Sequence, residues 1–397
     1  MANANNRAKT FVLIGLVVME LFATVDITGV TVLAPTLQNY FNIPAEMAGW
    51  ILMAFLIPFA LFLVPLGWLT DKTGQPEKVM ITSILGFAIF SLLCALAPNE
   101  YWLIAFRVFK GICAAGMFTT EFVIIIKYWE DPRRTVEIVI AGIAIGILTG
   151  PLIGAVFATT NLWRFFFLIG TLLALIAFIA YQNLKKLQPV KRPAAQMFLP
   201  AEIKFWAKTK FLTQMLFWGV LLNFTLALTT QGTNFLITLH VQEHLGKSPI
   251  FNGIILSVVA VGVLAANAIG IGSRFVKNLK VAAWGSAGAI AITLITLNLT
   301  NWISPAAFLN YFVFGIFLGI SLSTVELMIL KPLPISVLAL ANGIVVTSMH
   351  SGYGLVSSVI PVLYMHFGTK TTYFLSAILL SVILIFVSFQ RQQGKNK

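Results

Sequence analysis

Residues 46–70 have the sequence EMAGWILMAFLIPFALFLVPLGWLT, in which Glu46 is the only charged residue. About 20 apolar residues in a helix are enough to cross the hydrocarbon core of a bilayer. Apolar blocks of similar length recur along the chain, whereas a membrane β-barrel would show shorter segments that alternate apolar and polar residues. The stretch therefore predicts a transmembrane helix, and its recurrence predicts an all-α membrane protein.

The composition supports this fold class. The 397 residues are 59% hydrophobic and 10% charged, whereas soluble proteins average about 25% charged residues. We expect twelve transmembrane helices in two six-helix bundles, which leave no room for an attached catalytic domain. The first bundle is expected within residues 1–184, a linker at 185–209 and the second bundle at 210–397. The twelve spans are expected near residues 10–39, 46–70, 78–97, 100–127, 133–159, 164–184, 210–240, 249–273, 280–299, 303–330, 335–366 and 370–390.

The linker at 185–209 is basic and contains three prolines. Its second part, near 201–210, combines lysines with Ile203, Phe205 and Trp206, a pattern typical of a short amphipathic helix on anionic lipid. A disordered loop explains the same residues equally well.

Lysine and arginine are distributed unevenly between the two expected membrane faces. The chain has 26 of these residues against 13 Asp and Glu, a net charge of +13. With a cytoplasmic N-terminus, 21 of the 26 lie on the cytoplasmic side, Arg164, Lys247 and Lys370 lie opposite, and Arg107 and Lys110 lie within a span. Positive residues stay preferentially in the cytoplasm. We therefore expect both termini there, and membrane topology explains the charge better than a nucleic-acid partner does.

A recognisable loop follows the second span. Residues 67–78, GWLTDKTGQPEK, carry Gly67, Asp71 and Gly74, and this spacing resembles the signature loop between the second and third helices of the major facilitator superfamily. The resemblance implies that the loop latches a gate. The family usually has an arginine four residues after the aspartate, whereas this chain has Gln75 and Pro76.

Three more segments resemble the proton-coupled drug and metabolite antiporter branches of that superfamily. They are DITGVTVLAP at 26–35, RVFKG at 107–111, in which Lys110 replaces a glutamine, and GILTGPLIG at 146–154. The last segment is similar to the antiporter motif of those branches, which makes its small residues candidates for gating. These are Gly146, Gly150, Pro151 and Gly154. The resemblance covers the first half only, and the second half is assigned from its number of spans.

Ionisable residues inside the spans are candidates for function, because charge at the bilayer centre is costly. Arg107, Lys110 and Glu121 share one stripe of the span at 100–127, which we expect to face a water-filled cavity. Glu20 and Asp26 on the span at 10–39 supply negative charge. We expect Asp26 to pair with Arg107 and Glu20 to be freer; a purely structural ion pair is the alternative for Asp26.

The span at 210–240 carries a polar face. Asn223, Thr230 and Asn234 lie on one side of the expected helix, with Gln231 beside them. These side chains are predicted to contact substrate. Hydrogen bonding between helices is an equally good explanation.

Two further titratable residues lie in the second half. Glu326 is about one turn from Lys331, a spacing that favours snorkelling to the membrane surface or a gate pair over a proton site. His350, within SMHSGYG at 348–354, is expected to be a neutral, hydrogen-bonded histidine, with a proton site as the alternative.

Together these features predict a secondary active transporter that moves a small organic solute by alternating access. The resemblance favours a proton-coupled exporter, in which a carboxylate on the span at 10–39 binds either a proton or the substrate. Lys110 in place of glutamine favours an anionic or zwitterionic substrate. We expect a monomer in a bacterial inner membrane, with no cofactor and no metal.

Three alternatives stay open. The chain could import a small polar metabolite as a proton or cation symporter, or export an endogenous metabolite such as a siderophore. A membrane-embedded transferase would need clustered acids for a metal, whereas Glu130 and Asp131 are the only adjacent acids in the sequence. The two cysteines, Cys94 and Cys113, also lack the spacing of a metal site, and we do not expect an enzyme.

The charge distribution gives a first testable prediction. Single cysteines placed between residues 191 and 209 should resist an impermeant thiol reagent applied outside intact cells, because the linker is expected in the cytoplasm. Labelling after the cells are permeabilised is the control. Labelling of intact cells would contradict the assignment of the spans.

Overall fold

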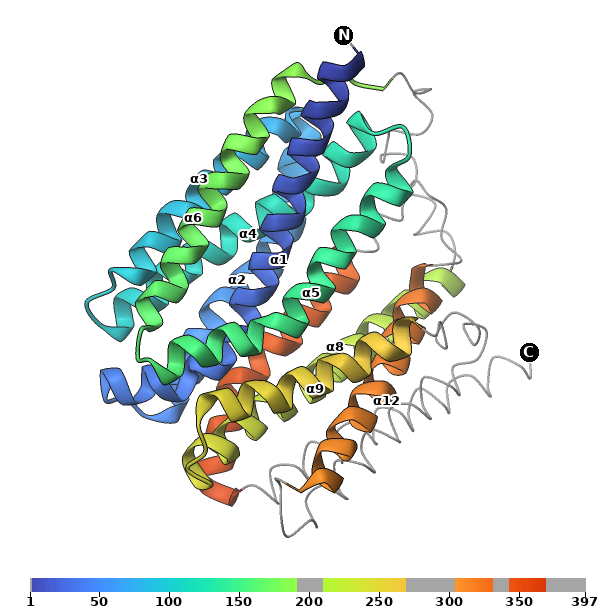
Figure 1. Ribbon diagram of the computed structural model, residues 1–397. Helices are drawn as coiled ribbons and strands as arrows, with labels where there is room; N and C mark the ends of the chain where they lie inside the picture. The colour runs from blue at the N-terminus through green and yellow to red at the C-terminus, as the bar shows by residue number, and fades with distance from the viewer. Residues whose placement is uncertain (1, 191–209, 269–303, 331–342, 369–397) are drawn as a thin grey trace, which may run out of the picture. The chain divides into compact units, whose positions relative to one another are not determined.

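The computed structural model describes residues 2–190, 210–268, 304–330 and 343–368 (Figure 1). Throughout these ranges the chain forms helices joined by short turns and contains no strand, which confirms the all-α prediction. Eight helices among the described residues are long and apolar enough to cross a membrane, namely Arg7–Phe41, Ala45–Thr70, Pro76–Ala95, Glu100–Tyr128, Ala141–Thr159, Trp163–Lys185, Pro249–Ala266 and Gly343–Gly368. The spans expected near 280–299 and 370–390, and the possible amphipathic helix, lie outside the described residues.

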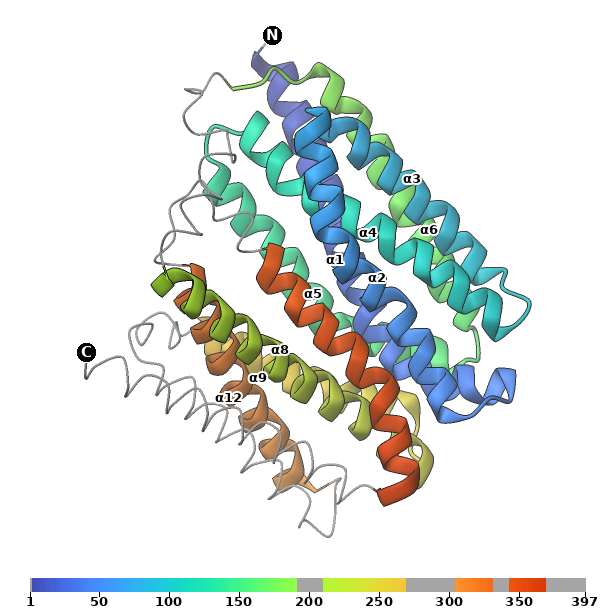
Figure 2. The same ribbon diagram turned by 180° about the vertical axis from the view of Figure 1, so that it is seen from behind.

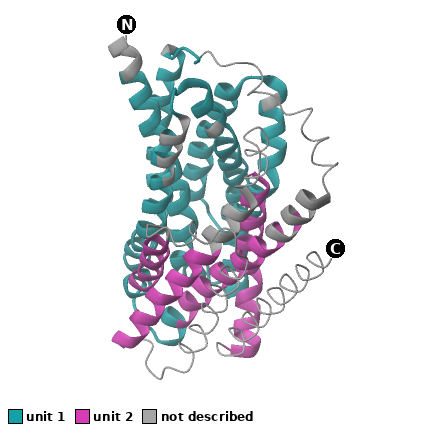
Figure 3. Ribbon diagram, turned by 90° about the vertical axis from the view of Figure 1, so that its right-hand side faces the viewer, with its two compact units in different colours: residues 1–192, 241–253 teal, residues 193–240, 254–397 magenta. Residues whose placement is uncertain are grey.

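The chain divides into two compact units (Figure 3). Unit 1 comprises residues 1–192 and 241–253, and unit 2 comprises residues 193–240 and 254–397. Unit 1 contains the six helices expected in the first bundle. They are α1 (Ala2–Phe41), α2 (Ala45–Thr73), α3 (Pro76–Ala95), α4 (Glu100–Tyr128), α5 (Pro132–Thr159) and α6 (Trp163–Tyr181), followed by the 3-10 turn η1 (Gln182–Lys186).

Local sequence explains several of the helix ends in unit 1. The side chain of Asn99 accepts a hydrogen bond from the Trp102 N–H at 3.1 Å and so caps the start of α4. Gly74 ends α2 with φ of 61°, a left-handed conformation that glycine adopts without strain. Pro76 then occupies the first turn of α3, where its missing N–H costs nothing.

Within unit 1, α1 packs mainly on α5 and α6, while α4 packs mainly on α2 and α3 (Figures 1 and 2). Small residues let α1 and α5 approach closely. A Cβ added to Gly154 would lie 2.7 Å from the Gly29 Cα, and one added to Gly146 would lie 2.6 Å from the Leu21 carbonyl oxygen. A Cβ on Gly150 would lie 3.1 Å from the Val25 Cα. Three of the four antiporter-like residues therefore place α5 directly against α1.

Unit 2 is described in part, by α8 (Lys210–Leu239), most of α9 (Pro249–Ala268), α12 (Pro305–Leu330) and the helix at Gly343–Gly368. A π-helical turn, η3 (His240–His244), follows α8, and its residues 241–244 belong to unit 1. Here too glycines allow close contact between helices. A Cβ on Gly262 of α9 would lie 2.9 Å from the Gly315 Cα of α12, and one on Gly352 would lie 2.6 Å from the Phe224 carbonyl oxygen of α8.

The contact of α5 with α1 predicts that Gly154→Ala is destabilising. Its added Cβ would meet backbone atoms that cannot move aside, and overpacking of this kind costs about 1–3 kcal/mol. Gly67→Ala is the matched control, because its Cβ would meet only a Thr119 methyl group, at 3.9 Å. Thermal unfolding in detergent should show a lower midpoint for Gly154→Ala alone, and equal midpoints for both variants would contradict the role of the close contact.

Candidate functional site

Asp26, Arg107 and Lys110 form a buried charge triad between α1 and α4. The Arg107 Nη1 lies 3.2 Å from Asp26 Oδ2, and the Lys110 Nζ lies 2.7 Å from Asp26 Oδ1. All three side chains have 0% exposure. The expected contact of Asp26 with Arg107 is therefore present, and Lys110 shares the same carboxylate.

Arg107 also connects the triad to α2. Its Nε donates a hydrogen bond to the Ile51 carbonyl oxygen at 2.6 Å, and its guanidinium carbon lies 5.3 Å from the Phe55 ring centroid. Its Nη2 has no hydrogen-bond partner among the described residues. One arginine thus joins α1, α2 and α4 through fixed, directional contacts.

Aromatic rings surround Lys110. Its Nζ lies 4.7 Å from the Phe87 ring centroid, 5.1 Å from Phe167 and 5.7 Å from Phe22. Two cations share one carboxylate, so the triad carries one surplus positive charge, and ring faces stabilise a cation through their quadrupole. In this structure Arg107 and Lys110 do not face water as predicted, because both side chains have no exposed surface. Asp26 contacts both cations, rings of α2 and α6 lie against Arg107, and rings of α1, α3 and α6 lie against Lys110.

Glu20 and Glu121 form a second polar cluster, which we call the carboxyl pair. Their carboxyl groups lie within hydrogen-bonding reach of each other, and both side chains are buried, with 8% and 2% exposure. Tyr181 at the end of α6 interacts electrostatically with both groups. Its hydroxyl and the Glu121 Oε1 have no hydrogen-bond partner among the described residues. Glu20 is thus less free than the sequence predicted, because Glu121 of α4 reaches it.

A hydrogen bond between two carboxyl groups has a chemical consequence. An ionised carboxylate only accepts hydrogen bonds, and a protonated one donates. A hydrogen bond between Glu20 and Glu121 therefore requires a proton on one of them. No sequence pattern marks this pair, because the two acids lie on different helices.

The loop that resembles the family signature has the expected turn. Gly67 lies in α2, and the Gly74 N–H donates to the Thr70 carbonyl oxygen at 3.0 Å. The side chain of Asp71 lies outside the described part of the molecule. No arginine follows in this loop, but Glu77 of α3 accepts hydrogen bonds from the Lys127 Nζ at 2.6 Å and the Tyr128 hydroxyl at 2.8 Å.

Sequence analysis missed this contact between α3 and α4. Glu77 lies in the first turn of α3 and Lys127 in the last turn of α4. Since consecutive spans run in opposite directions, the sequence already placed both residues on the same membrane face. The two side chains are about a quarter exposed, at 24% and 25%.

The polar face of α8 is used in part for helix packing. The Asn223 Nδ2 donates to the Val345 carbonyl oxygen at 3.0 Å and to the Ser348 Oγ at 3.3 Å. The Asn234 Oδ1 is buried without a hydrogen-bond partner among the described residues. Gln231 is buried as well. Asn223 thus fits the packing alternative, and contact of Asn234 and Gln231 with substrate stays a prediction.

His350 lies in the helix at Gly343–Gly368 with 8% exposure. Its Nδ1 lies 2.9 Å from the Val346 carbonyl oxygen, and its ring packs edge-on against Tyr353 with centroids 5.7 Å apart. This is the environment expected of a hydrogen-bonded histidine. The side chain of Glu326 and all of Lys331 lie outside the described residues.

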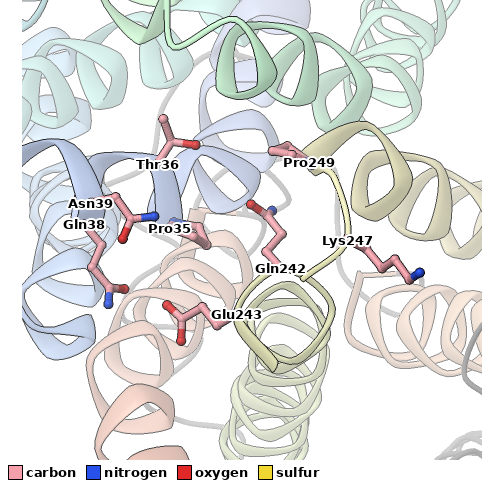
Figure 4. A pocket seen from close by; sticks show the side chains of 8 residues that line it. All are labelled: Pro35, Thr36, Gln38, Asn39, Gln242, Glu243, Lys247 and Pro249. Carbon is pink, nitrogen blue, oxygen red and sulfur yellow. The ribbon is translucent and has the colours of Figure 1, made fainter. Parts of the chain in front are cut away.

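A polar pocket of about 470 Å³ lies at the C-terminal end of α1, within unit 1 (Figure 4). The Gln242 Nε2 donates to the Val32 carbonyl oxygen at 3.1 Å, and Gln38 hydrogen-bonds Glu243. Partial burial raises the pKa of the Glu243 carboxyl, and the contact with Gln38 opposes that shift. The pocket is lined by Pro35, Thr36, Gln38, Asn39, Gln242, Glu243, Lys247 and Pro249.

The triad predicts a large effect of Asp26→Asn on stability. This change leaves two buried cations without their carboxylate, and breaking a buried ion pair costs about 3–5 kcal/mol. Lys110→Gln keeps the contact of Asp26 with Arg107 and removes the surplus charge, so it should unfold near the wild-type temperature. Thermal unfolding in detergent measures both, and wild-type stability of Asp26→Asn would contradict a fixed anion at this position.

Comparison with known proteins identifies the family. The family model of the Major Facilitator Superfamily matches residues 16–334. The chain is 30% identical over 166 residues to a multidrug resistance protein B homolog of Mycobacterium tuberculosis, and 31% identical over 202 residues to the efflux pump dotC of Dothistroma septosporum. These alignments cover 41% and 50% of this chain, which spans only 30% and 34% of the length of those relatives.

A solved structure supports the fold over nearly the whole chain. The crystal structure of a bacterial homolog of the human lysosomal transporter Spinster, in an inward-facing and occupied conformation, is similar with a TM-score of 0.72. It covers 97% of both chains at 16% identity. Among the described residues, no group of three or more His, Cys, Asp or Glu could hold a metal ion. The match of the family model over residues 16–334 shows that the chain belongs to the Major Facilitator Superfamily, and the solved structure supports the twelve-helix, multi-pass membrane fold of that family.

Proposed function

We propose that the chain is a proton-coupled exporter of small organic solutes. The observation that carries the proposal is the packing of the antiporter-like segment of α5 on α1. Gly146 contacts the Leu21 backbone, next to Glu20, and Gly150 contacts the Val25 backbone, next to Asp26. The segment that resembles proton-coupled antiporters thus packs on the same turns of α1 that carry the two buried carboxyl groups.

Names of relatives support export. Several relatives at low identity are efflux proteins, among them an MFS thioclapurine efflux transporter of Claviceps purpurea, 30% identical over 169 residues. In our proposal, a carboxyl group in unit 1 takes up a proton from outside and releases it to the cytoplasm, and the same cycle carries substrate outwards. A carboxyl group keeps its proton in a dry site and loses it when hydrated or paired with a cation. Alternating access changes its hydration and so couples the two fluxes.

The surplus positive charge of the triad bears on the substrate. Lys110 and Arg107 have no exposed surface, so they act on a substrate through their field and not by contact. In a medium of low dielectric constant such a field is weakly screened. We therefore retain an anionic or zwitterionic substrate as part of the proposal. The proposal also includes a monomer in a bacterial inner membrane. The distribution of lysine and arginine supports a cytoplasmic position for both termini.

Transport into inside-out membrane vesicles tests this function. A panel of anionic, zwitterionic and cationic fluorescent compounds should show accumulation of an anion or zwitterion when the lumen is acidic, and a protonophore should abolish it. Lys110→Gln should weaken transport of the anion several-fold, because it removes the surplus charge. Vesicles with equal pH on both sides are the control.

Three other outcomes of the vesicle assay would each contradict one part of the proposed function. Accumulation that ignores the pH gradient would contradict proton coupling. A compound that leaves the vesicles together with protons would instead identify an importing symporter. Preferred transport of lipophilic cations by the wild type would contradict the proposed substrate charge.

A further inference from the structure

Two separate polar layers lie between α1 and α4. Glu20 precedes Asp26 by six residues, about 9 Å along a helix, and Glu121 follows Lys110 by eleven residues, about 16 Å. Because consecutive spans alternate in direction, α1 and α4 are antiparallel. The charge triad therefore forms one layer, and the carboxyl pair forms a second layer towards the N-terminus of α1.

The triad is poorly suited to exchange a proton. Each oxygen of Asp26 contacts a cation, and the carboxylate has no exposed surface. Protonation of Asp26 would leave the charges of Arg107 and Lys110 buried without a counter-ion, which is costly. Arginine itself keeps its proton in proteins. Asp26 is thus a fixed anion.

The carboxyl pair has the opposite properties. Neither Glu20 nor Glu121 has an ion-pair partner in the part of the chain that the structure describes. A hydrogen bond between the two carboxyl groups requires a proton, and Glu20 retains 8% exposure where Asp26 has none. Among the described residues the Glu121 Oε1 and the Tyr181 hydroxyl have no hydrogen-bond partner, which leaves hydrogen-bonding capacity for the state in which the proton has left.

The surroundings of the carboxyl pair contain few other titratable groups. Tyr181 is the group contributed by α6. The parts of the packed helices α2, α3 and α5 at residues 47–70, 79–95 and 141–159 contain no Asp, Glu, Lys, Arg or His, and Cys94 is their only other titratable side chain. On the same helices, Asp26 of the triad follows Glu20 by six residues, and Lys127, which contacts Glu77, follows Glu121 by six residues.

We propose that Glu20 and Glu121 together bind the transported proton, and that the charge triad anchors the helices without exchanging a proton. The pair holds one shared proton when the site is dry, releases that proton to water on the cytoplasmic side as two carboxylates, and regains one from the outer side. This proposal rests on the proton-coupled export proposed above, and it assigns the proton to a different group from Asp26.

Infrared spectroscopy of the purified full-length protein tests the site without a substrate. Near neutral pH the wild type should show the C=O stretching band of a protonated carboxylic acid, which shifts in deuterium oxide. Glu20→Gln and Glu121→Gln should each remove or displace the band. Asp26→Asn should leave it unchanged in those molecules that remain folded, because Asp26 is ionised in the triad.

Thermal unfolding provides the control for folding. A glutamine amide can donate to the remaining carboxylate, so both Gln variants should unfold close to the wild-type temperature. Glu20→Asp, which keeps a carboxyl group, should retain a protonated band. The proposal is overturned if the wild type lacks the band, or if the band survives in both Gln variants.

Transport separates this proposal from the function on which it rests. The vesicle assay uses the anionic dye calcein as a defined probe alongside the panel. In Glu20→Gln and Glu121→Gln, accumulation driven by the pH gradient should fall at least tenfold below that of the wild type. Exchange of labelled for unlabelled compound should persist in both variants. Full accumulation in both variants would overturn the proton site alone. A wild type without gradient-driven transport would overturn the proposed function, and the infrared result would still decide the site.

Discussion

The carboxylate of Asp26 is the shared counter-ion of two cations in a part of the bundle that has no exposed surface. Charge without a counter-ion is expensive in such a place, so α1, α2 and α4 have to pack with Asp26, Arg107 and Lys110 in contact. The hydrogen bond from Arg107 to Ile51 fixes the third helix. The close contact of α5 with the opposite side of α1, through glycines, then holds α1 in that position.

The need to keep Asp26 ionised between two cations means that charged residues in this bundle serve two different purposes, namely fixing helices and carrying a proton. A group that fixes helices must keep its ionisation state, and both oxygens of Asp26 are committed to cations. A group that carries a proton must change state at little structural cost, and Glu20 with Glu121 can do so because neither holds an ion pair in the described structure. The aromatic rings around Lys110 reinforce this division, since they keep its surplus charge in place.

Much of this arrangement was predictable from the sequence, and the remainder depended on geometry between helices. Hydropathy located the spans, and equal depth in the membrane predicted the contact of Asp26 with Arg107. The angular position of a residue around one helix axis does not reveal which neighbouring helix covers that face. The prediction that Lys110 faces water therefore does not hold in this structure. The partner of Glu20 was missed for the same reason, because the crossing of α1 and α4 decides whether Glu121 reaches it.

The contact of Glu77 with Lys127 shows how a weak interaction suits a different role. Its side chains are about a quarter exposed, and ion pairs in contact with water contribute about 0–1 kcal/mol. Such a pair breaks and re-forms at little energetic cost, whereas breaking the buried triad is costly. Its acid lies in the first turn of α3 and its base in the last turn of α4. The strength of each charge contact thus follows from how deeply it is buried. The fully buried pairs of Asp26 with Arg107 and Lys110 are permanent, and the part-exposed pair of Glu77 with Lys127 is reversible.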